Sequence, residues 1–414
     1  MRASAQPPHT PRMRSDGGWK LGCAVLAVAA LAGCAIAPSP PPPVTAPPAG
    51  AARYRAVAWD ALPGWRDDRV QDSWLAFVVG CKALVARAAT TVQWRAACNA
   101  ASAIDGNDAG AIRAFYEAQF KPYAIEAPDG RAEGLVTGYY EPMVTGSRTA
   151  TSRFGVPLYG VPEDLLTIDL ASVHPELAGK RLRGRLDGRR VVPYWTRADI
   201  MNGRRPAARV LAYVDDPVDA FFLEVQGSGR VALTDGTTVR VGYADQNGHP
   251  YKAIGRVLVD RGALSLEQVS MQAIRAWAKA HIDEMPALLT ENPSYVFFRE
   301  IPPAAPGTLE AAIDGPIGAL GVPLAAGRTI AVDPRSVPLG TPVFLVTTYP
   351  ASDAELARVV LAHDTGGAIR GAIRADLFFG FGTEAGEQAG RMKQPGRMWM
   401  LWPRDAPLPG AVQP

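Results

Sequence analysis

The stretch AHDTGGAIRGAIRADLFFGFG, residues 362–382, places two aspartates twelve positions apart among glycines and apolar residues. Carboxylates in such surroundings are unusual, since a segment selected only for packing would carry aliphatic side chains there. If Asp364 and Asp376 share one cleft, mutual repulsion and desolvation raise the pKa of at least one of them. A proton then stays available near neutral pH, as a general acid requires. The alternative is that each aspartate only hydrogen-bonds a neighbouring turn.

Short runs of β-forming residues lie on both sides of this stretch and are separated by Gly and Pro. They indicate β-barrels rather than alternating layers of strand and helix. The runs are residues 135–140, 190–194, 220–225, 230–233, 238–243, 295–298, 329–332, 342–346, 358–362 and 397–401.

Three segments carry helical signals instead. Residues 74–104 are rich in Ala, with apolar residues at helical spacing, and Asn107 and Asp108 can cap a second helix. Residues 265–268 have the pattern of a capping box that opens a third helix. The apolar positions are Ile112, Phe115, Tyr116 and Phe120 in the second helix, and Val269, Ile274 and Trp277 in the third.

The N-terminus has the layout of a bacterial secretory signal. Basic residues precede an apolar run over residues 21–32, which is too short for a stable transmembrane helix. The run ends in Leu-Ala-Gly-Cys34, which resembles the lipobox of bacterial lipoproteins. Residues 1–33 are therefore expected to be removed and the Cys34 thiol to be lipidated, with an ordinary buried cysteine as the alternative. By the lipoprotein rule, Ala35, which is not Asp, implies the outer membrane, with the protein facing the periplasm.

A proline-rich segment follows the expected anchor. Residues 38–48 cannot donate enough backbone hydrogen bonds for a sheet and favour extended polyproline II, at about 3.1 Å per residue. We expect residues 34–52 to form a tether, in which the eleven residues 38–48 give roughly 30 Å of spacer between the lipid surface and the folded part.

Charge and histidine spacing exclude other classes of protein. Residues 1–33 hold four basic residues and one acidic residue, a net charge of +3, so the whole-chain charge of +3 leaves a mature protein near zero. Such a chain has no electrostatic footprint for nucleic acid.

The histidines show no ligand spacing, so no metal or other cofactor is expected. They are His9, His174, His249, His281 and His363. Neighbours on a strand point to opposite faces, so a structural role is expected for His363 beside Asp364.

Cys81 and Cys98 remain once Cys23 and Cys34 are assigned to the signal and the anchor. An oxidising compartment permits them to pair. The disulfide would close a loop of about 17 residues and contribute on the order of 3 kcal/mol to stability. Two separately buried thiols are the alternative.

Seven segments, taken in order, resemble the membrane-bound lytic murein transglycosylase A family. Each segment alone is a weak signal, whereas seven in one order across roughly residues 105–402 identify the chain as similar to this family. The segments are TGYYEP (137–142), VQGSGR (225–230), YADQNGHPY (243–251), SMQAIR (270–275), NPSYVFF (292–298), AVDPRS (331–336) and the aspartate stretch (362–382).

The resemblance implies a mainly β fold with peripheral helices. It consists of a double-psi β-barrel domain, an inserted second small β-barrel domain and a substrate groove between them. On this chain, the first barrel would comprise residues 53–142, with the N-terminal helices, and residues 293–402, with the aspartate cluster. Residues 143–292 would form the insert, and residues 403–414 a tail.

The resemblance also implies an enzyme, a non-hydrolytic peptidoglycan lyase. It would cleave the β-1,4 bond between N-acetylmuramic acid and N-acetylglucosamine and form 1,6-anhydromuramic acid ends. Ordinary glycosidases need two carboxyls. Here one suffices, because the attacking group is the 6-hydroxyl of the same sugar, already held near the anomeric carbon. The implied partners are peptidoglycan glycan strands and outer-membrane lipid, and complexes with other cell-wall enzymes stay open.

By motif position in the family, Asp376 protonates the leaving oxygen and then takes the proton of the hydroxyl. Asp364 and Asp333 would support it, although an Asp-Pro turn explains Asp333 equally well. Tyrosine offers a sugar an apolar face and a hydroxyl tip, with core packing as the alternative. Strand alternation turns only one of Tyr139 and Tyr140 toward the groove. The expected substrate contacts are Thr137, Tyr139, Tyr140, Gln226, Gly227 and Ser228.

Two other functions fit parts of the pattern. The sequence DTG at residues 364–366 matches the triad of aspartic proteases, but a monomeric protease needs two copies and this chain has one. A double-psi barrel can also hold glycan without cleaving it, so a non-catalytic peptidoglycan-binding protein is the second alternative.

Overall fold

The computed structural model describes residues 52–177, 180 and 182–409. The expected signal peptide, Cys34 and residues 34–51 of the tether lie outside these residues. Within the described ranges, no helix combines the length and the apolar character that a membrane span requires.

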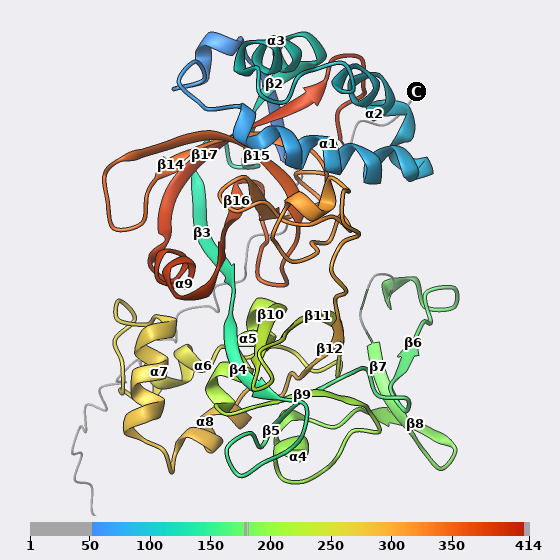
Figure 1. The fold of residues 1–414 in the computed structure, drawn as a ribbon, viewed down its shortest axis with the longest axis vertical. Coiled ribbons are helices and arrows are strands. Elements are labelled where there is room, and N and C mark those ends of the chain that lie inside the picture. Colours follow the sequence, from blue (N-terminus) through green and yellow to red (C-terminus); the bar gives the residue numbers. More distant parts are fainter. Residues whose placement is uncertain (1–51, 178–179, 181, 410–414) are drawn as a thin grey trace, which may run out of the picture. The chain divides into compact units, whose positions relative to one another are not determined.

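The first sheet closes into a barrel built from both ends of the folded chain. Its strands are β1 (Arg53–Ala56), β2 (Phe120–Glu126), β3 (Gly134–Glu141), β13 (Thr329–Val332), β14 (Pro342–Thr348), β15 (Glu355–Asp364), β16 (Arg374–Phe381) and β17 (Lys393–Pro403). Strand β17 pairs with both β14 and β3, which joins the order β17-β14-β15-β13-β16-β3 into a ring. The pairs β13–β15 and β16–β3 are parallel. Figure 1 shows β3, early in the sequence, beside the late strands of the barrel.

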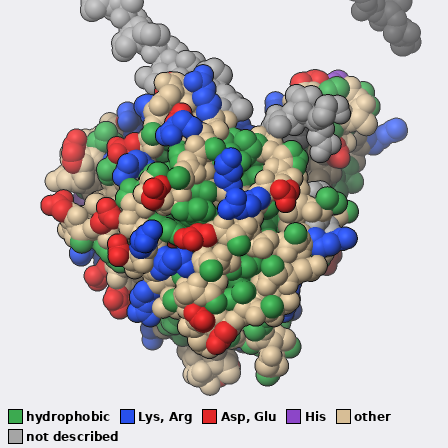
Figure 2. All heavy atoms as spheres, turned by 90° about the horizontal axis from the view of Figure 1, so that it is seen from above, with side chains coloured by type: hydrophobic (Ala, Val, Ile, Leu, Met, Phe, Trp, Pro, Cys, Tyr) green, Lys and Arg blue, Asp and Glu red, His purple; other side chains and the backbone are tan. Residues whose placement is uncertain are grey.

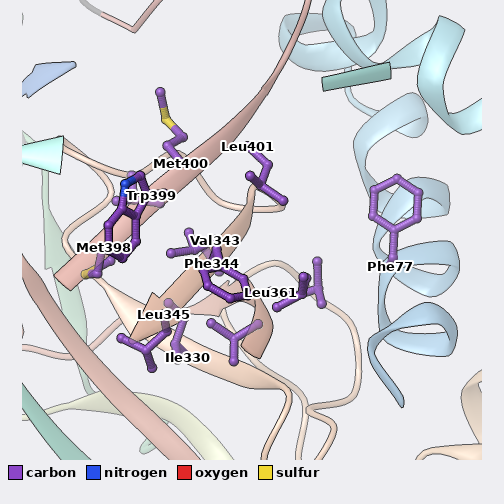
Figure 3. Packing of buried hydrophobic residues seen from close by; sticks show 14 of the residues in the cluster. Phe77, Ile330, Val343, Phe344, Leu345, Leu361, Met398, Trp399, Met400 and Leu401 are labelled. Carbon is purple, nitrogen blue, oxygen red and sulfur yellow. The ribbon is translucent and has the colours of Figure 1, made fainter. Parts of the chain in front are cut away.

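Helices cover one side of this barrel. Strands β13 and β14 are buried over nearly their whole length, so both of their faces need apolar neighbours. Helices α1 (Gln71–Ala86), α2 (Ala88–Ala101) and α3 (Ala109–Gln119) supply part of this cover and share one core cluster with the strands. Figure 3 shows Phe77 of α1 beside the cluster that contains Phe344 and Leu361.

The helical signals near the N-terminus correspond to these three helices. Asp108 caps α3 by accepting a hydrogen bond from the backbone N–H of Ala111. Phe120, expected on this helix, instead begins β2. A disulfide joins Cys81 of α1 to Cys98 of α2, with Cα atoms 5.5 Å apart.

A second barrel-like sheet lies between β3 and β13 in the sequence. Its strands are β4 (Met143–Ser147), β5 (Val156–Tyr159), β9 (Val210–Val214), β10 (Ser228–Leu233), β11 (Thr238–Gln246) and β12 (Val296–Glu300). They pair in the order β12-β11-β10-β4-β9-β5, and a bridge between Gly160 and Phe298 brings the two edges together. Because β12 pairs with β11, this sheet extends beyond residue 292, the expected end of the insert.

Smaller elements decorate the two barrels. Strands β6 (Leu166–Ile168), β7 (Leu182–Asp187) and β8 (Arg190–Pro193) form a separate sheet. The other helices are α4 (Arg197–Met201), α5 (Pro217–Gln226), α6 (Ile254–Asp260), α7 (Met271–Ala280), α8 (Met285–Thr290) and α9 (Gly382–Arg391), with 3-10 turns at Trp59–Ala61, Pro175–Leu177 and Glu310–Ala312. The expectation of a mainly β fold with peripheral helices is confirmed. Figure 2 shows basic and acidic side chains interspersed on one face, in keeping with a net charge near zero.

Two further sequence-based predictions of local structure are wrong. Residues 220–225 belong to helix α5 rather than to a strand, because Asp216 caps the helix, Pro217 starts it, and Gly227 ends it at φ 77°. The capping box at residues 265–268 opens no helix. The Gln268 side chain does accept a hydrogen bond from Ser265 N–H, but the chain only turns there, and α7 begins at Met271 with Ser270 as its cap.

Candidate active site

Three neighbouring strands bring the two aspartates together. Strand β13 lies between β15 and β16, and its Ala331 pairs with Asp364 on one side and with Asp376 on the other. Residues opposite one another on paired strands project to the same face of a sheet. Both carboxyls therefore occupy one face, on either side of the small Ala331 side chain.

Asp376 is partly exposed, and one side chain of the described part of the chain donates a hydrogen bond to it. The Thr137 hydroxyl, opposite it on β3, donates to Oδ1 at 2.5 Å. Burial raises the pKa of Asp376, and the Asp364 charge raises it further. The Thr137 hydroxyl and the Arg374 charge lower this pKa, but burial and the Asp364 charge outweigh them, so the pKa of Asp376 is raised overall. A carboxyl with a raised pKa keeps its proton toward neutral pH, which suits a general acid.

Asp364 has more hydrogen-bond donors than Asp376. The Tyr139 hydroxyl donates to Oδ2 at 3.0 Å, and the backbone N–H of Ala319 donates to Oδ1 at 2.9 Å. The backbone N–H of Thr365 is a third donor. Burial raises the pKa of Asp364 and outweighs these three hydrogen bonds, which lower the pKa by stabilising the charged form.

Asp333 holds the loop that joins the two aspartate strands. It forms an ion pair with Arg335 at 2.7 Å, and its Oδ2 accepts a hydrogen bond from Gly371 N–H at 2.9 Å. Burial raises the pKa of Asp333, but the Arg335 guanidinium and the backbone donors outweigh it and hold the pKa at about 2. Among the described residues, its hydrogen bonds reach neither Asp364 nor Asp376. Gly371 has φ 117°, a conformation that favours glycine.

The two tyrosines of β3 have different surroundings. Tyr139 reaches Asp364, while Tyr140 is 5% exposed and packs against Ala385 and Ala389 of α9. The Tyr140 hydroxyl lies 3.5 Å from the sulfur of Met271 on α7. Strand alternation thus directs Tyr139 toward the aspartates and Tyr140 into a small hydrophobic core.

The VQGSGR segment joins the second barrel to β3. Gln226 accepts a hydrogen bond from Tyr140 N–H through Oε1 at 3.4 Å. Gly227 ends α5, and Ser228 begins β10. All three are partly exposed.

Two groups at the site were missed by the sequence analysis. Ala319 acts through its backbone N–H, so its side chain gives no signal. Arg374 is two residues before Asp376 on β16, and residues two apart on a strand share a face. That spacing could have indicated its influence on the pKa of Asp376.

No group of three or more metal-ligating side chains occurs within the described residues. A cavity of about 460 Å³ lies between α1 and the end of β16, and neither Asp364 nor Asp376 lines it. The aspartates are thus not part of that cavity.

His363 precedes Asp364 on β15, and its side chain points away from the site into the protein core. It is fully buried, and neither ring nitrogen has a hydrogen-bond partner among the described residues. A Cβ at Gly80 of α1 would lie 2.7 Å from its Nε2, so the glycine makes room for the ring. Burial lowers the pKa of His363 to about 3. The imidazole is therefore neutral at physiological pH.

This burial predicts acid-dependent stability. Since the pKa is about 3 in the folded state and 6.5 in the unfolded state, the unfolded chain binds the extra proton between these values. The free energy of unfolding should fall below pH 6.5 by up to about 1.4 kcal/mol per pH unit. Urea unfolding of wild type and His363→Leu at pH 7.5 and pH 5 measures this, and the variant should lose much less stability on acidification. Equal losses in both proteins would contradict the assignment.

Comparison with known proteins supports one family. The model of the MltA specific insert domain matches residues 135–299, and that of the 3D domain matches residues 328–402. The membrane-bound lytic murein transglycosylase A of Escherichia coli K12 is 33% identical over 297 residues, which cover 70% of this chain and 71% of that protein.

Solved structures agree in fold. The crystal structure of MltA from Neisseria gonorrhoeae has a TM-score of 0.73 and 35% identity, covering 87% of this chain and 95% of that one. The crystal structure of Escherichia coli MltA with bound chitohexaose has a TM-score of 0.61 and 27% identity, covering 86% and 95%. The chain therefore belongs to the membrane-bound lytic murein transglycosylase A family.

Proposed function

We propose that this protein cleaves the β-1,4 bond between N-acetylmuramic acid and N-acetylglucosamine in peptidoglycan and leaves a 1,6-anhydromuramic acid end. Family membership supports the reaction class. The chitohexaose bound to the Escherichia coli relative supports a glycan chain as the ligand.

Asp376 is the proposed acid and base. Its carboxyl donates a proton to the glycosidic oxygen as the bond from that oxygen to the muramic acid C1 breaks, and the N-acetylglucosamine leaves with a free 4-hydroxyl. The 6-hydroxyl of the muramic acid then bonds to C1, and its proton goes to the Asp376 carboxylate, which restores the acid. The observation that carries this role is a partly exposed carboxyl whose pKa is raised by burial and by a second carboxyl beside it.

The other site residues have proposed supporting roles. Asp364 keeps a negative charge near the positive charge that develops on the sugar ring, and Asp333 fixes the Gly371 loop between the two strands. We propose that the glycan lies between the two barrels, where Gln226, Gly227 and Ser228 contact it. Their partial exposure and the contact of Gln226 with β3 support this proposal.

Digestion of purified sacculi tests the function. Mass spectrometry of the released fragments should find anhydromuramic acid ends, which lack one water relative to reducing ends. Reducing N-acetylmuramic acid would mean that water attacks, as in a muramidase, and binding without release would mean a non-catalytic protein. Either result contradicts the proposal.

The anchor is proposed from the sequence. The relatives are named membrane-bound enzymes, and the lipobox-like Leu-Ala-Gly-Cys34 supports lipidation at Cys34 and passage to the outer membrane. Cell fractionation should find the wild type in outer-membrane fractions and Cys34→Ser in the soluble periplasm. Membrane attachment of the Ser variant would exclude this anchor.

A further inference from the structure

The proposed reaction requires one proton on two neighbouring carboxyls, and it must reside on Asp376. Both carboxyls are subject to the same main effect, since burial raises the pKa of each. Burial alone therefore does not decide which one is protonated. The difference between the two must come from their hydrogen-bond partners.

The two carboxyls differ in the number of hydrogen bonds that they accept. Asp364 accepts from Ala319 N–H, from Thr365 N–H and from the Tyr139 hydroxyl, whereas Asp376 accepts from the Thr137 hydroxyl. A carboxylate gains from every donor that points at it, so the larger set of donors favours the charge on Asp364.

Among the described residues, Tyr139 is the one side chain that donates to Asp364. Strand β3 runs parallel to β16 with Thr137 opposite Asp376, and Tyr139 follows two residues later on the same face. The Tyr139 ring packs on Phe378, with centroids 5.2 Å apart, which fixes the direction of the hydroxyl. Burial and the two aspartate charges raise the pKa of Tyr139 well above its usual value, so the phenol keeps its proton and remains a donor.

We infer that Tyr139 is a positioning residue that keeps the proton off Asp364 and so leaves it on Asp376, rather than a contact for sugar. This inference rests on the proposed function, because it matters only if Asp376 acts as the acid. Strand β3 then contacts both carboxyls, since the Thr137 hydroxyl donates to Asp376 and the Tyr139 hydroxyl donates to Asp364.

Other charges near the pair do not supply this asymmetry. The Arg374 charge favours an ionised Asp376 and so opposes it. Strand β13 presents Ala331, and His363 is buried and neutral. The elements packed against β15 and β16 carry charges that are exposed or paired elsewhere: Glu141 of β3 with Arg230, Glu384, Glu387 and Arg391 on α9, Asp72 with Arg328, and Lys82 with Glu310.

Steady-state kinetics of Tyr139→Phe across pH test the inference. Without the hydroxyl, part of the singly protonated enzyme holds its proton on Asp364, so kcat at the optimum should fall about ten-fold. Because Asp364 then keeps its proton to higher pH, the acidic limb of the kcat profile should move to higher pH. KM should change by less than about two-fold, since no sugar contact is lost.

Two further variants sharpen the experiment. Thr137→Val removes the donor to Asp376, so it should move the basic limb of the profile to higher pH and leave the acidic limb in place. Tyr349→Phe, which loses a hydroxyl that contacts Arg358, is the matched control and should leave the profile unchanged.

The outcomes separate the inference from the function. A raised KM with unchanged kcat in Tyr139→Phe would make Tyr139 a sugar contact and overturn the inference. The inference would also be overturned if neither the acidic limb in Tyr139→Phe nor the basic limb in Thr137→Val moved. Thermal melting shows whether each variant folds, and if one folds poorly the other still tests the inference. In either case, anhydromuropeptides released by the wild type would leave the proposed function intact.

Discussion

Asp376→Asn should lose nearly all release of anhydromuropeptides, by about 10³-fold or more in kcat. A single acid–base group contributes about 10²–10⁴-fold, and in the proposed mechanism one carboxyl serves both proton transfers. Asn keeps the size of the side chain and can still hydrogen-bond Thr137, so the loss would reflect chemistry rather than folding. Quantitative mass spectrometry of digested sacculi measures the rate.

Asp364→Asn is the companion variant. It removes the charge that helps to raise the pKa of Asp376 but leaves the Asp376 carboxyl in place. Activity should fall less than in Asp376→Asn, and the basic limb of the pH profile should move to lower pH. If Asp376→Asn instead keeps wild-type activity while Asp364→Asn loses it, the acid is Asp364 and the proposed roles are reversed.

Arg197→Met should strongly destabilise the second barrel. Arg197 on α4 and Glu224 on α5 form a two-pronged ion pair, at 2.9 and 2.8 Å, with side-chain exposures of 4% and 6%. The guanidinium also donates to the carbonyls of Asn292 and Ser294. Removing it leaves Glu224 buried without its partner, at a cost of about 3–5 kcal/mol.

Thermal melting measures this loss, which corresponds to roughly 5–15 °C in Tm. Arg209→Met is the matched control, because Arg209 pairs with Glu300 at a side-chain exposure of 75% and should leave Tm nearly unchanged. The double variant Arg197→Met with Glu224→Leu should be more stable than Arg197→Met alone, since no unpaired charge stays buried. Equal melting temperatures for Arg197→Met and Arg209→Met would contradict the argument.

The sequence predicted much of the fold because its strands are short, apolar and bounded by Gly and Pro. Residues 329–332 form β13 as expected, and the run at 358–362 lies inside β15. Helix α5 was missed because a short apolar run such as residues 220–223 fits a strand and a buried helix equally well. Only the flanking Asp216-Pro217 and Gly227 distinguish the two.

The candidate site could be predicted as residue types but not as contacts. Motif order singled out Asp376, Asp364 and Thr137. That Thr137 lies opposite Asp376 depends on the register of two parallel strands far apart in sequence, which no local pattern encodes. The donor at Ala319 is backbone, so it leaves no trace in side-chain chemistry.

The closed ring of the first barrel also constrains when the protein can become active. Strand β3 is made early, whereas β15 and β16, which carry the aspartates, come near the end of the chain, and β17 closes the ring after them. Pairings between such distant segments form late and slowly. A chain interrupted before residue 362 contains neither carboxyl. During synthesis, the capacity to cleave peptidoglycan therefore arises only when the chain is almost complete.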